Sequence, residues 1–199
     1  MDTLHEQSGC ADSVSSQTRR YDGNRVLLRP ISYEDTNLIV QWRNETAVKS
    51  NLLTQQDINA SGHKAYLQSK VVPRECDQFI IDVLDTNESV GSVFLKNIDL
   101  QKGEGEFGIF IGTKGRGRGF AREATLLLLE HAFSTLGLKR VYLTVFADNL
   151  PGIKAYEKAG FSIDPDKTCE VDCAEGRRTL LRMTIPRERF DSAEISSNI

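Results

Sequence analysis

The sequence predicts an α/β (α+β) fold, in which helices pack on one mixed β-sheet. Three observations lead to this prediction. The chain has 199 residues, which suits one domain with tails. Short apolar runs typical of strands alternate with segments whose apolar residues recur at helical spacing. Gly, Pro and Asn separate these segments. The predicted order is β, α, α, three strands, α, β, α, β, β.

The first half of the chain predicts a strand, two helices, an antiparallel hairpin and a further strand. Pro30 ends the first strand, and Ser32 or Asp35 can cap the helix that follows. A turn at 85–88 joins the two strands of the hairpin. These elements are expected at 25–29, about 38–48, 60–71, 79–84, 89–98 and 104–111.

The second half contains a strong helical pattern at 121–136, which Gly137 can end. A strand rich in β-branched and aromatic residues follows at 139–147. Pro151 suits the start of a short helix that ends before Gly160. The segments 161–163 and 179–185 are expected to pair as the last strands across a polar loop.

The two ends of the chain have little apolar patterning. Residues 1–22 are rich in Ser, so we expect a disordered tail without the apolar stretch of a secretory signal. Residues 23–187 form the expected domain. Residues 188–199 resemble the first segment and are expected to form a flexible C-terminal tail.

Composition excludes several classes of protein. Lys and Arg number 25 against 28 Asp and Glu, a net charge of −3, whereas proteins that bind nucleic acid usually carry a basic excess. The apolar runs are far shorter than the roughly 20 residues of a membrane span. We therefore expect no nucleic acid partner, no membrane partner and a cytoplasmic location. Cys169 and Cys173 lack a second ligand pair nearby, so free thiols and no metal site are expected.

The most informative segment is the Gly-rich turn between the strand at 104–111 and the long helix. Its glycines at 115, 117 and 119 allow positive φ and a close approach of a ligand to the backbone. The helix N-terminus adds unpaired N–H groups and a partial positive charge. Basic side chains lie in the same turn, at Lys114, Arg116, Arg118 and Arg122. Together these features indicate a site for a phosphorylated ligand, with a pyrophosphate as a good fit.

Other phosphate motifs do not fit this turn. A Walker loop would need Lys and then Ser or Thr where Arg118 and Gly119 stand. The dinucleotide fingerprint would need glycine at Phe120. An RNA contact of the RGG type usually belongs to a disordered repeat, whereas this is one turn between two strong elements. The remaining alternative is a flexible connection with solvated arginines.

Two segments resemble motifs of the GNAT superfamily, the acetyl-CoA-dependent N-acetyltransferases. Residues 116–121, Arg-Gly-Arg-Gly-Phe-Ala, resemble the pattern [RQ]-x-x-G-x-[GA]. Residues 149–161 resemble N-x-x-[SA]-x-x-x-Y-x-x-x-G-F, although Gly152 replaces the usual Ser or Ala. The resemblance extends over about residues 25–185.

The resemblance implies a mostly antiparallel central sheet flanked by helices, in which a splayed strand pair forms the CoA cleft. The pantetheine arm would pair with the backbone near Ile109 and Ile111, which could also polarise the thioester carbonyl. Asn149 would hydrogen-bond the cofactor arm, although a helix cap is the alternative and the two roles are compatible. The pyrophosphate would be held by Arg116, Gly117, Arg118, Gly119, Phe120 and Ala121.

The implied reaction is direct attack of a primary amine on acetyl-CoA in a ternary complex. Tyr156 would stand near the sulfur and could give a proton to the leaving thiolate, unless it is only a core aromatic. Glu106 could accept the proton of the amine, and a solvated strand carboxylate is the alternative. His5 is placed in the tail, and His63 and His131 on helix surfaces, so none is expected to be catalytic.

The residues expected to contact the acceptor are Trp42-Arg43-Asn44, in the segment 38–48 where a spaced Val follows them. This segment resembles a subgroup that acetylates nucleotide-linked 4-amino sugars and, more loosely, enzymes that acetylate ribosomal protein N-termini. Polyamine and aminoglycoside acetyltransferases share the scaffold, so a small-molecule or peptide amine is expected. A core position for Trp42 and a surface salt bridge for Arg43 are the alternatives.

A protein of another class is also considered, namely an acyl-CoA sensor without turnover. The presence of Tyr156 and Asn149 counts against it. A monomer or homodimer is expected.

Overall fold

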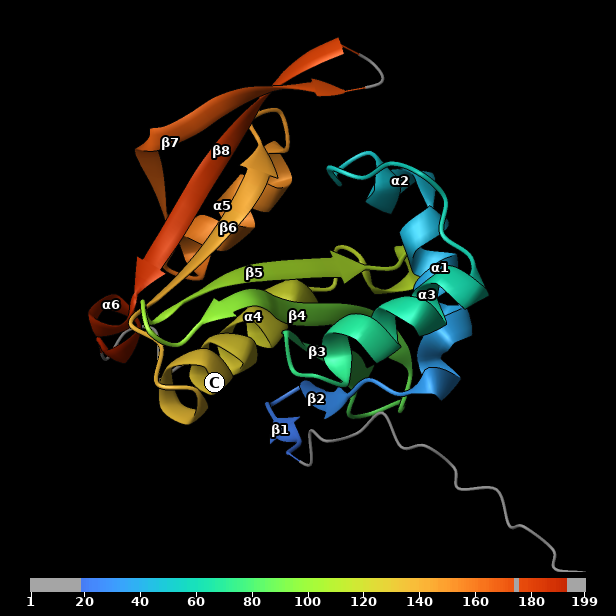
Figure 1. Ribbon diagram of the computed structural model, residues 1–199. Coiled ribbons are helices and arrows are strands. Elements are labelled where there is room, and N and C mark those ends of the chain that lie inside the picture. The colour runs from blue at the N-terminus through green and yellow to red at the C-terminus, as the bar shows by residue number, and fades with distance from the viewer. Residues whose placement is uncertain (1–18, 174–175, 193–199) are drawn as a thin grey trace, which may run out of the picture.

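The computed structural model describes residues 19–173 and 176–192. In this part of the chain one sheet runs in the order β1-β2-β3-β4-β5-β6-β8-β7 (Figure 1), and every neighbouring pair is antiparallel except β5 and β6. The strands are β1 (Tyr21–Asp22), β2 (Val26–Pro30), β3 (Cys76–Val83), β4 (Ser89–Asp99), β5 (Glu104–Ile111), β6 (Arg140–Phe146), β7 (Ser162–Cys173) and β8 (Gly176–Pro186). The predicted mixed, mostly antiparallel sheet flanked by helices is confirmed.

The helices cover both faces of the sheet. They are η1 (Tyr33–Asp35), α1 (Thr36–Asn44), α2 (Thr46–Lys49), α3 (Ala60–Tyr66), η2 (Leu67–Val71), η3 (Thr113–Gly115), α4 (Phe120–Glu130), η4 (His131–Thr135), α5 (Leu150–Lys158) and α6 (Arg187–Asp191). Figure 1 shows α1, α2 and α3 gathered together, away from α4. Side chains alternate along β3, so Phe79 and Ile81 pack in the α4 core while Ile80 packs in the core of α1.

Strands β5 and β6 separate soon after they begin. They pair only over three residues of each strand, from Glu104 opposite Arg140 to Glu106 opposite Tyr142. Beyond this point β5 remains paired with β4, and β6 remains paired with β8. The predicted splayed strand pair is therefore present, and it leaves one edge of β5 from Phe107 onward free of β6.

The ordered fold extends beyond both predicted boundaries. Tyr21, expected in the N-terminal tail, pairs with Leu28 in the sheet and is only 6% exposed, because its ring is in the main core. At the other end α6 buries Phe190 against Phe133, although this helix was expected in the flexible tail. Residues 1–18 and 193–199 of the two predicted tails lie outside the described residues.

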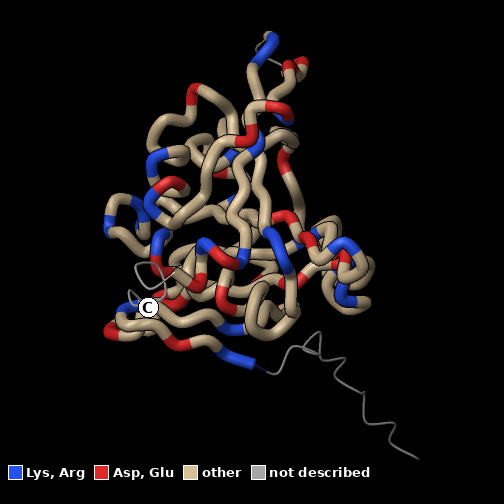
Figure 2. Tube along the Cα trace, turned by 90° about the vertical axis from the view of Figure 1, so that its left-hand side faces the viewer, with Lys and Arg blue, Asp and Glu red and all other residues tan. Residues whose placement is uncertain are grey.

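The last two strands are much longer than predicted. β7 and β8 form one long hairpin that extends beyond the rest of the sheet (Figure 1), with a register shift between Asp164 and Cys169. The residues expected to form a polar loop are therefore mostly strand. They are polar because both faces of this projecting hairpin are exposed over much of its length. Figure 2 shows that Lys and Arg and Asp and Glu are both spread over the described chain.

Two histidines predicted at the surface are buried. His131 is 6% exposed, and its two ring nitrogens form hydrogen bonds with Tyr21 and Asp77. It is covered because the rings of Tyr21 and Phe79 pack against it at the start of η4. His63 is 5% exposed and faces Thr36, since α3 packs against α1.

Candidate active site

The Gly-rich turn leaves the start of α4 open to a ligand. Gly117 and Gly119 have φ of 71° and 83°, a backbone conformation that glycine adopts without strain. No side chain caps α4 at Gly119, so the first N–H groups of the helix are available to an anion. This geometry fits the pyrophosphate of CoA. Gly115 has no positive φ, contrary to expectation; a Cβ there would lie 2.8 Å from both Val90 and Ile111.

The arginines of the turn are held by other parts of the chain. Arg116 donates from Nε to the carbonyl of Ile111 at 3.0 Å. The guanidinium groups of Arg118 and Arg25 both lie against the ring of Phe120, at 4.6 and 4.8 Å from its centroid. Phe120 itself is buried, so this proposed cofactor residue supports the turn while its backbone N–H lies at the helix start. Ala121 is the next residue of the same turn of α4.

A cavity of about 640 Å³ begins between the splayed strands and continues under α1 and α3. Ile109 lies on its β5 wall, and Leu143 and Val145 lie on its β6 wall. Ile111 is half-buried further along β5 and is paired with Gly91 of β4. The free edge of β5 can therefore pair with an extended amide chain, as the resemblance implied for pantetheine.

Asn149 acts as the N-cap of α5. Its Oδ1 accepts from the N–H of Gly152 at 3.1 Å, which is the cap role considered from the sequence. Gly152 is the residue that departs from the family pattern, and a Cβ there would lie 2.6 Å from Asn149 Nδ2. The glycine therefore leaves space for the Asn149 amide in this position.

Tyr156 lies at the junction of cavity and core. Its ring packs edge-on against Phe107 and Phe161, with centroids 6.0 and 6.1 Å away, and it lines the cavity. Burial raises the pKa of the phenol to about 12, so the hydroxyl is protonated at neutral pH. The ring is thus a core aromatic, which was one of the two sequence interpretations, and it also borders the cavity. A place near the thioester sulfur stays a prediction.

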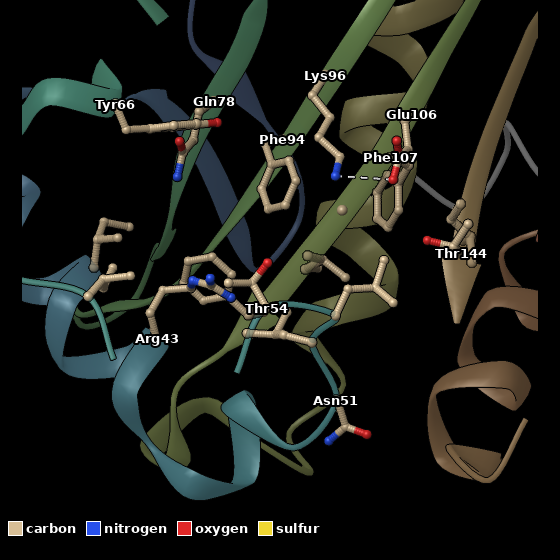
Figure 3. A pocket seen from close by; sticks show the side chains of 18 of the residues that line it. Arg43, Asn51, Thr54, Tyr66, Gln78, Phe94, Lys96, Glu106, Phe107 and Thr144 are labelled. Atoms are coloured by element: carbon tan, nitrogen blue, oxygen red, sulfur yellow. Dashed lines mark ion pairs between the residues drawn. The ribbon is translucent and has the colours of Figure 1, made fainter. Parts of the chain in front are cut away.

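Glu106 lines the same cavity from β5. Its carboxylate forms an ion pair with Lys96 at 3.1 Å (Figure 3). It also accepts a hydrogen bond from Asn97 Nδ2 at 2.8 Å. The side chain is only 15% exposed, so it is not the freely solvated carboxylate considered as the alternative.

The three residues predicted to contact the acceptor do three different things. Trp42 is buried, and its indole packs where a Cβ at Gly112 would lie 2.4 Å away, so it is a core anchor. Asn44 accepts from the N–H of Ile58 and donates to its carbonyl, both at 2.9 Å, so it fixes the loop before α3. Only Arg43 lines the cavity.

Several cavity residues were not identified from the sequence. They are His63, Tyr66, Gln78, Phe94, Lys96 and Thr54. They come from α3, β3, β4 and the loop after α2, so no sequence spacing connects them. The polar residues of an otherwise apolar strand, such as Gln78 in β3, are the one signal that could have pointed to some of them.

Arg178 joins elements on the two sides of the site. It pairs with Asp148 through two hydrogen bonds, at 2.6 and 3.1 Å, and its guanidinium lies 3.5 Å over the ring of Phe146. A further bond of 3.0 Å reaches the carbonyl of Ser50 beyond α2. The helices over the cavity and the β6–β8 side are thereby linked across the splay.

The described residues contain no cluster of His, Cys, Asp and Glu able to hold a metal ion. Cys76, Cys169 and Cys173 are free thiols, as expected, while Cys10 lies outside the described residues. Within the described chain, no helix has the length and apolar character needed to cross a membrane.

Comparison with known proteins identifies the family. A family model described as an acetyltransferase (GNAT) domain matches residues 25–162. The spermidine N(1)-acetyltransferase of Escherichia coli K12 is 27% identical over 165 residues, 83% of this chain and 88% of that protein. An uncharacterized prophage-derived N-acetyltransferase of Bacillus subtilis, YokL, is 36% identical over 144 residues, which cover 71% of this chain and 78% of that one.

A solved structure has the same fold. The spermidine N-acetyltransferase of Vibrio cholerae, in complex with CoA and spermine, superposes with a TM-score of 0.79 at 21% identity and covers 84% of this chain and 99% of that one. Of the two sequence motifs, the second contributes Tyr156 to the cavity described above, and the first forms the turn at the start of α4. The chain belongs to the GNAT family and is an acetyl-CoA-dependent N-acetyltransferase.

Proposed function

We propose that the protein transfers the acetyl group directly to a primary amine within a ternary complex. The observation that supports this most strongly is the single cavity, which joins the slit between β5 and β6 to the space under α1 and α3. Both reactants can meet there without a covalent enzyme intermediate. The described lining of the cavity contains no cysteine that could take up the acetyl group.

Glu106 is the proposed base. An amine is mainly protonated at neutral pH and must lose a proton before or during attack. The Glu106 carboxylate faces the cavity, and Lys96 and Asn97 fix its orientation. It would take the proton directly or through one water molecule. The polarised backbone of β5 near Ile109 would stabilise the negative charge that develops on the carbonyl oxygen.

Tyr156 is the proposed partner of the departing sulfur. Its pKa of about 12 lies well above the value of about 8.5 for an ordinary thiol, so complete proton transfer to a thiolate is unfavourable. The hydroxyl would instead stabilise the thiolate mainly by donating a hydrogen bond. We therefore modify the simple general-acid role that the resemblance implies.

Paired variants test these assignments. Tyr156→Phe and Glu106→Gln should each lower kcat by about 10²–10⁴, the usual range for an acid–base group, with Km for acetyl-CoA within a few-fold. A loss nearer the lower limit is expected for Tyr156→Phe if it only donates a hydrogen bond. The matched controls are Glu104→Gln, whose carboxylate pairs with Arg140 outside the cavity, and Tyr33→Phe, whose hydroxyl binds Gln68.

The result of these assays also separates an enzyme from a sensor. Steady-state release of CoA thiol with a panel of amines supports turnover, and Tyr156→Phe with unchanged kcat would leave Tyr156 as a packing residue. Binding of acetyl-CoA without turnover of any amine would support the sensor alternative.

The acceptor remains a choice between classes of amine. The resemblance of residues 42–44 favours a nucleotide-linked amino sugar, whereas the names of the Escherichia coli and Vibrio cholerae relatives favour a polyamine. A peptide N-terminus or an aminoglycoside would also supply a primary amine. One related structure is described as dodecameric, so a larger assembly is an alternative to the proposed monomer or homodimer.

A further inference from the structure

Arg43 places an uncompensated positive charge in the acceptor half of the cavity. The side chain extends from α1 into the space between Phe94 and Thr54 (Figure 3) and is half-buried. In the described part of the chain, its guanidinium has neither a hydrogen bond nor an ion pair. Burial lowers the pKa of Arg43, but a guanidinium remains charged at neutral pH.

The other charges on the cavity wall are already paired. Lys96 is 3.1 Å from Glu106, and Asp57 is 2.5 Å from Lys49. The charges of the lining residues sum to zero, but Asp57 is neutralised by Lys49, which lies outside the lining. The one charge that no ion pair compensates is therefore that of Arg43. A half-buried guanidinium without a partner is unfavourable unless a ligand provides one.

Two deeply buried polar atoms border the same space. Gln78 is 4% exposed, and its Oε1 has no partner among the described residues. Its orientation is fixed because Ser92 donates its hydroxyl to the carbonyl of Phe79 and must accept from Gln78 Nε2. His63 Nε2 is also without a partner, and burial lowers the pKa of this imidazole to about 4, so it is neutral. Since native proteins rarely leave buried polar atoms unpaired, these two indicate a polar ligand.

We infer that the acceptor carries an anionic group, a carboxylate or a phosphate, which pairs with Arg43. This inference rests on the proposed function, because it concerns the acceptor of that reaction. A polyamine would bring two or more positive charges next to Arg43, which disfavours it. The phosphates of CoA are not the intended partner, because residues 113–121 of the pyrophosphate turn do not line this cavity.

Matched acceptors test the inference on the intact protein. The pairs are an amino-sugar phosphate with the free amino sugar, and a dipeptide with its C-terminal amide, alongside spermidine. Each pair keeps the amine and differs in the anion, so the pairs also distinguish a phosphate from a carboxylate. One charge-assisted pair predicts about a 10–150-fold higher kcat/KM for the anionic member of at least one pair.

Substitutions of Arg43 then assign the effect to this residue. Arg43→Met should remove the preference by raising the KM of the anionic acceptor, with KM for acetyl-CoA unchanged. Arg43→Lys should restore part of it. Arg43→Glu should shift the preference toward spermidine. Lys64→Met is the matched control, because Lys64 is an exposed residue of α3 outside the cavity.

The outcomes separate the two proposals. Equal kcat/KM for both members of every pair, or an Arg43→Met variant that retains the preference, overturns the inference while the proposed function stands. A rise in KM for acetyl-CoA instead would assign Arg43 to the cofactor and also overturn it. If no amine is turned over, the proposed function fails, and the inference is judged by binding: an anionic acceptor should then raise the Tm of the parent with CoA but not that of Arg43→Met.

Discussion

Removal of the N-terminal segment should have sharply different effects depending on whether Tyr21 is included. The ring of Tyr21 packs edge-on against Phe79 and His131, with centroids 5.7 and 5.2 Å away. Its hydroxyl pairs with His131 Nδ1, and His131 Nε2 lies 2.7 Å from Asp77. The segment thus completes a buried chain of polar groups as well as the apolar core.

The size of the effect follows from these contacts. Loss of a buried aromatic side chain costs about 3–5 kcal/mol of unfolding free energy. A domain of this size loses roughly 2–4 °C of Tm per kcal/mol. A protein lacking residues 1–22 should therefore melt about 6–20 °C lower than the parent. Tyr21→Phe keeps the ring but leaves His131 Nδ1 without its partner, which costs about 1–3 kcal/mol.

Thermal unfolding followed by circular dichroism measures these differences. The control is a protein lacking residues 1–18, which keeps Tyr21 and should melt within about 2 °C of the parent. If removal of residues 1–22 changed Tm no more than removal of 1–18, Tyr21 would not contribute to the core and the reasoning would fail. A large loss in both would mean that residues 1–18 themselves stabilise the domain.

Two further predictions concern the Gly-rich turn and the dependence of stability on pH. At a hundredfold excess over Kd, acetyl-CoA should stabilise the parent by about 2.7 kcal/mol and so raise its Tm. Gly119→Val should abolish this rise, whereas Gly137→Val, at a similar φ of 69° but outside the turn, should keep it. An intact rise in Gly119→Val would contradict the proposed pyrophosphate site. The pKa of His63 is 6.5 in the unfolded chain and about 4 in the folded protein, so the unfolded chain binds more protons between these pH values. The free energy of unfolding should therefore decrease by up to about 3 kcal/mol as pH falls through this window. Denaturant unfolding at pH 7 and pH 4.5 should show a smaller decrease for His63→Leu than for the parent, and equal decreases would refute the shift.

The sequence predicts most accurately the elements that surround the proposed cofactor site. The strand at 104–111 has the same bounds in the structure, and the turn that follows it has positive φ at Gly117 and Gly119. These features are local, because a φ requirement or a helix start is met by the residues at that position themselves. The same holds for the helix at 150–158, which begins at the Asn149 cap.

The failures concern burial created by distant segments. No local pattern shows that Tyr21 lies over His131, since the two residues are 110 positions apart. The extent of β7 and β8 could not be predicted either, because their exposed residues lack the alternation that marks a half-buried strand. In both segments, tertiary contacts and not the local sequence pattern determine the structure.

The three residues predicted to contact the acceptor also show that the sequence alone does not reveal which side chains are buried by distant segments. Trp42, Arg43 and Asn44 are consecutive, and successive residues of a helix point about 100° apart. One motif therefore supplies a residue that anchors the core, a charge in the cavity and a residue that fixes a loop. The sequence of the motif does not show which residue has which role. A relative can have the same three residues for packing reasons and still use a different acceptor. Whether the charge of Arg43 is compensated depends only on the residues that lie opposite it in the cavity. In this chain they leave it unpaired, so the charge of the acceptor, more than the motif, is the property that assays should vary first.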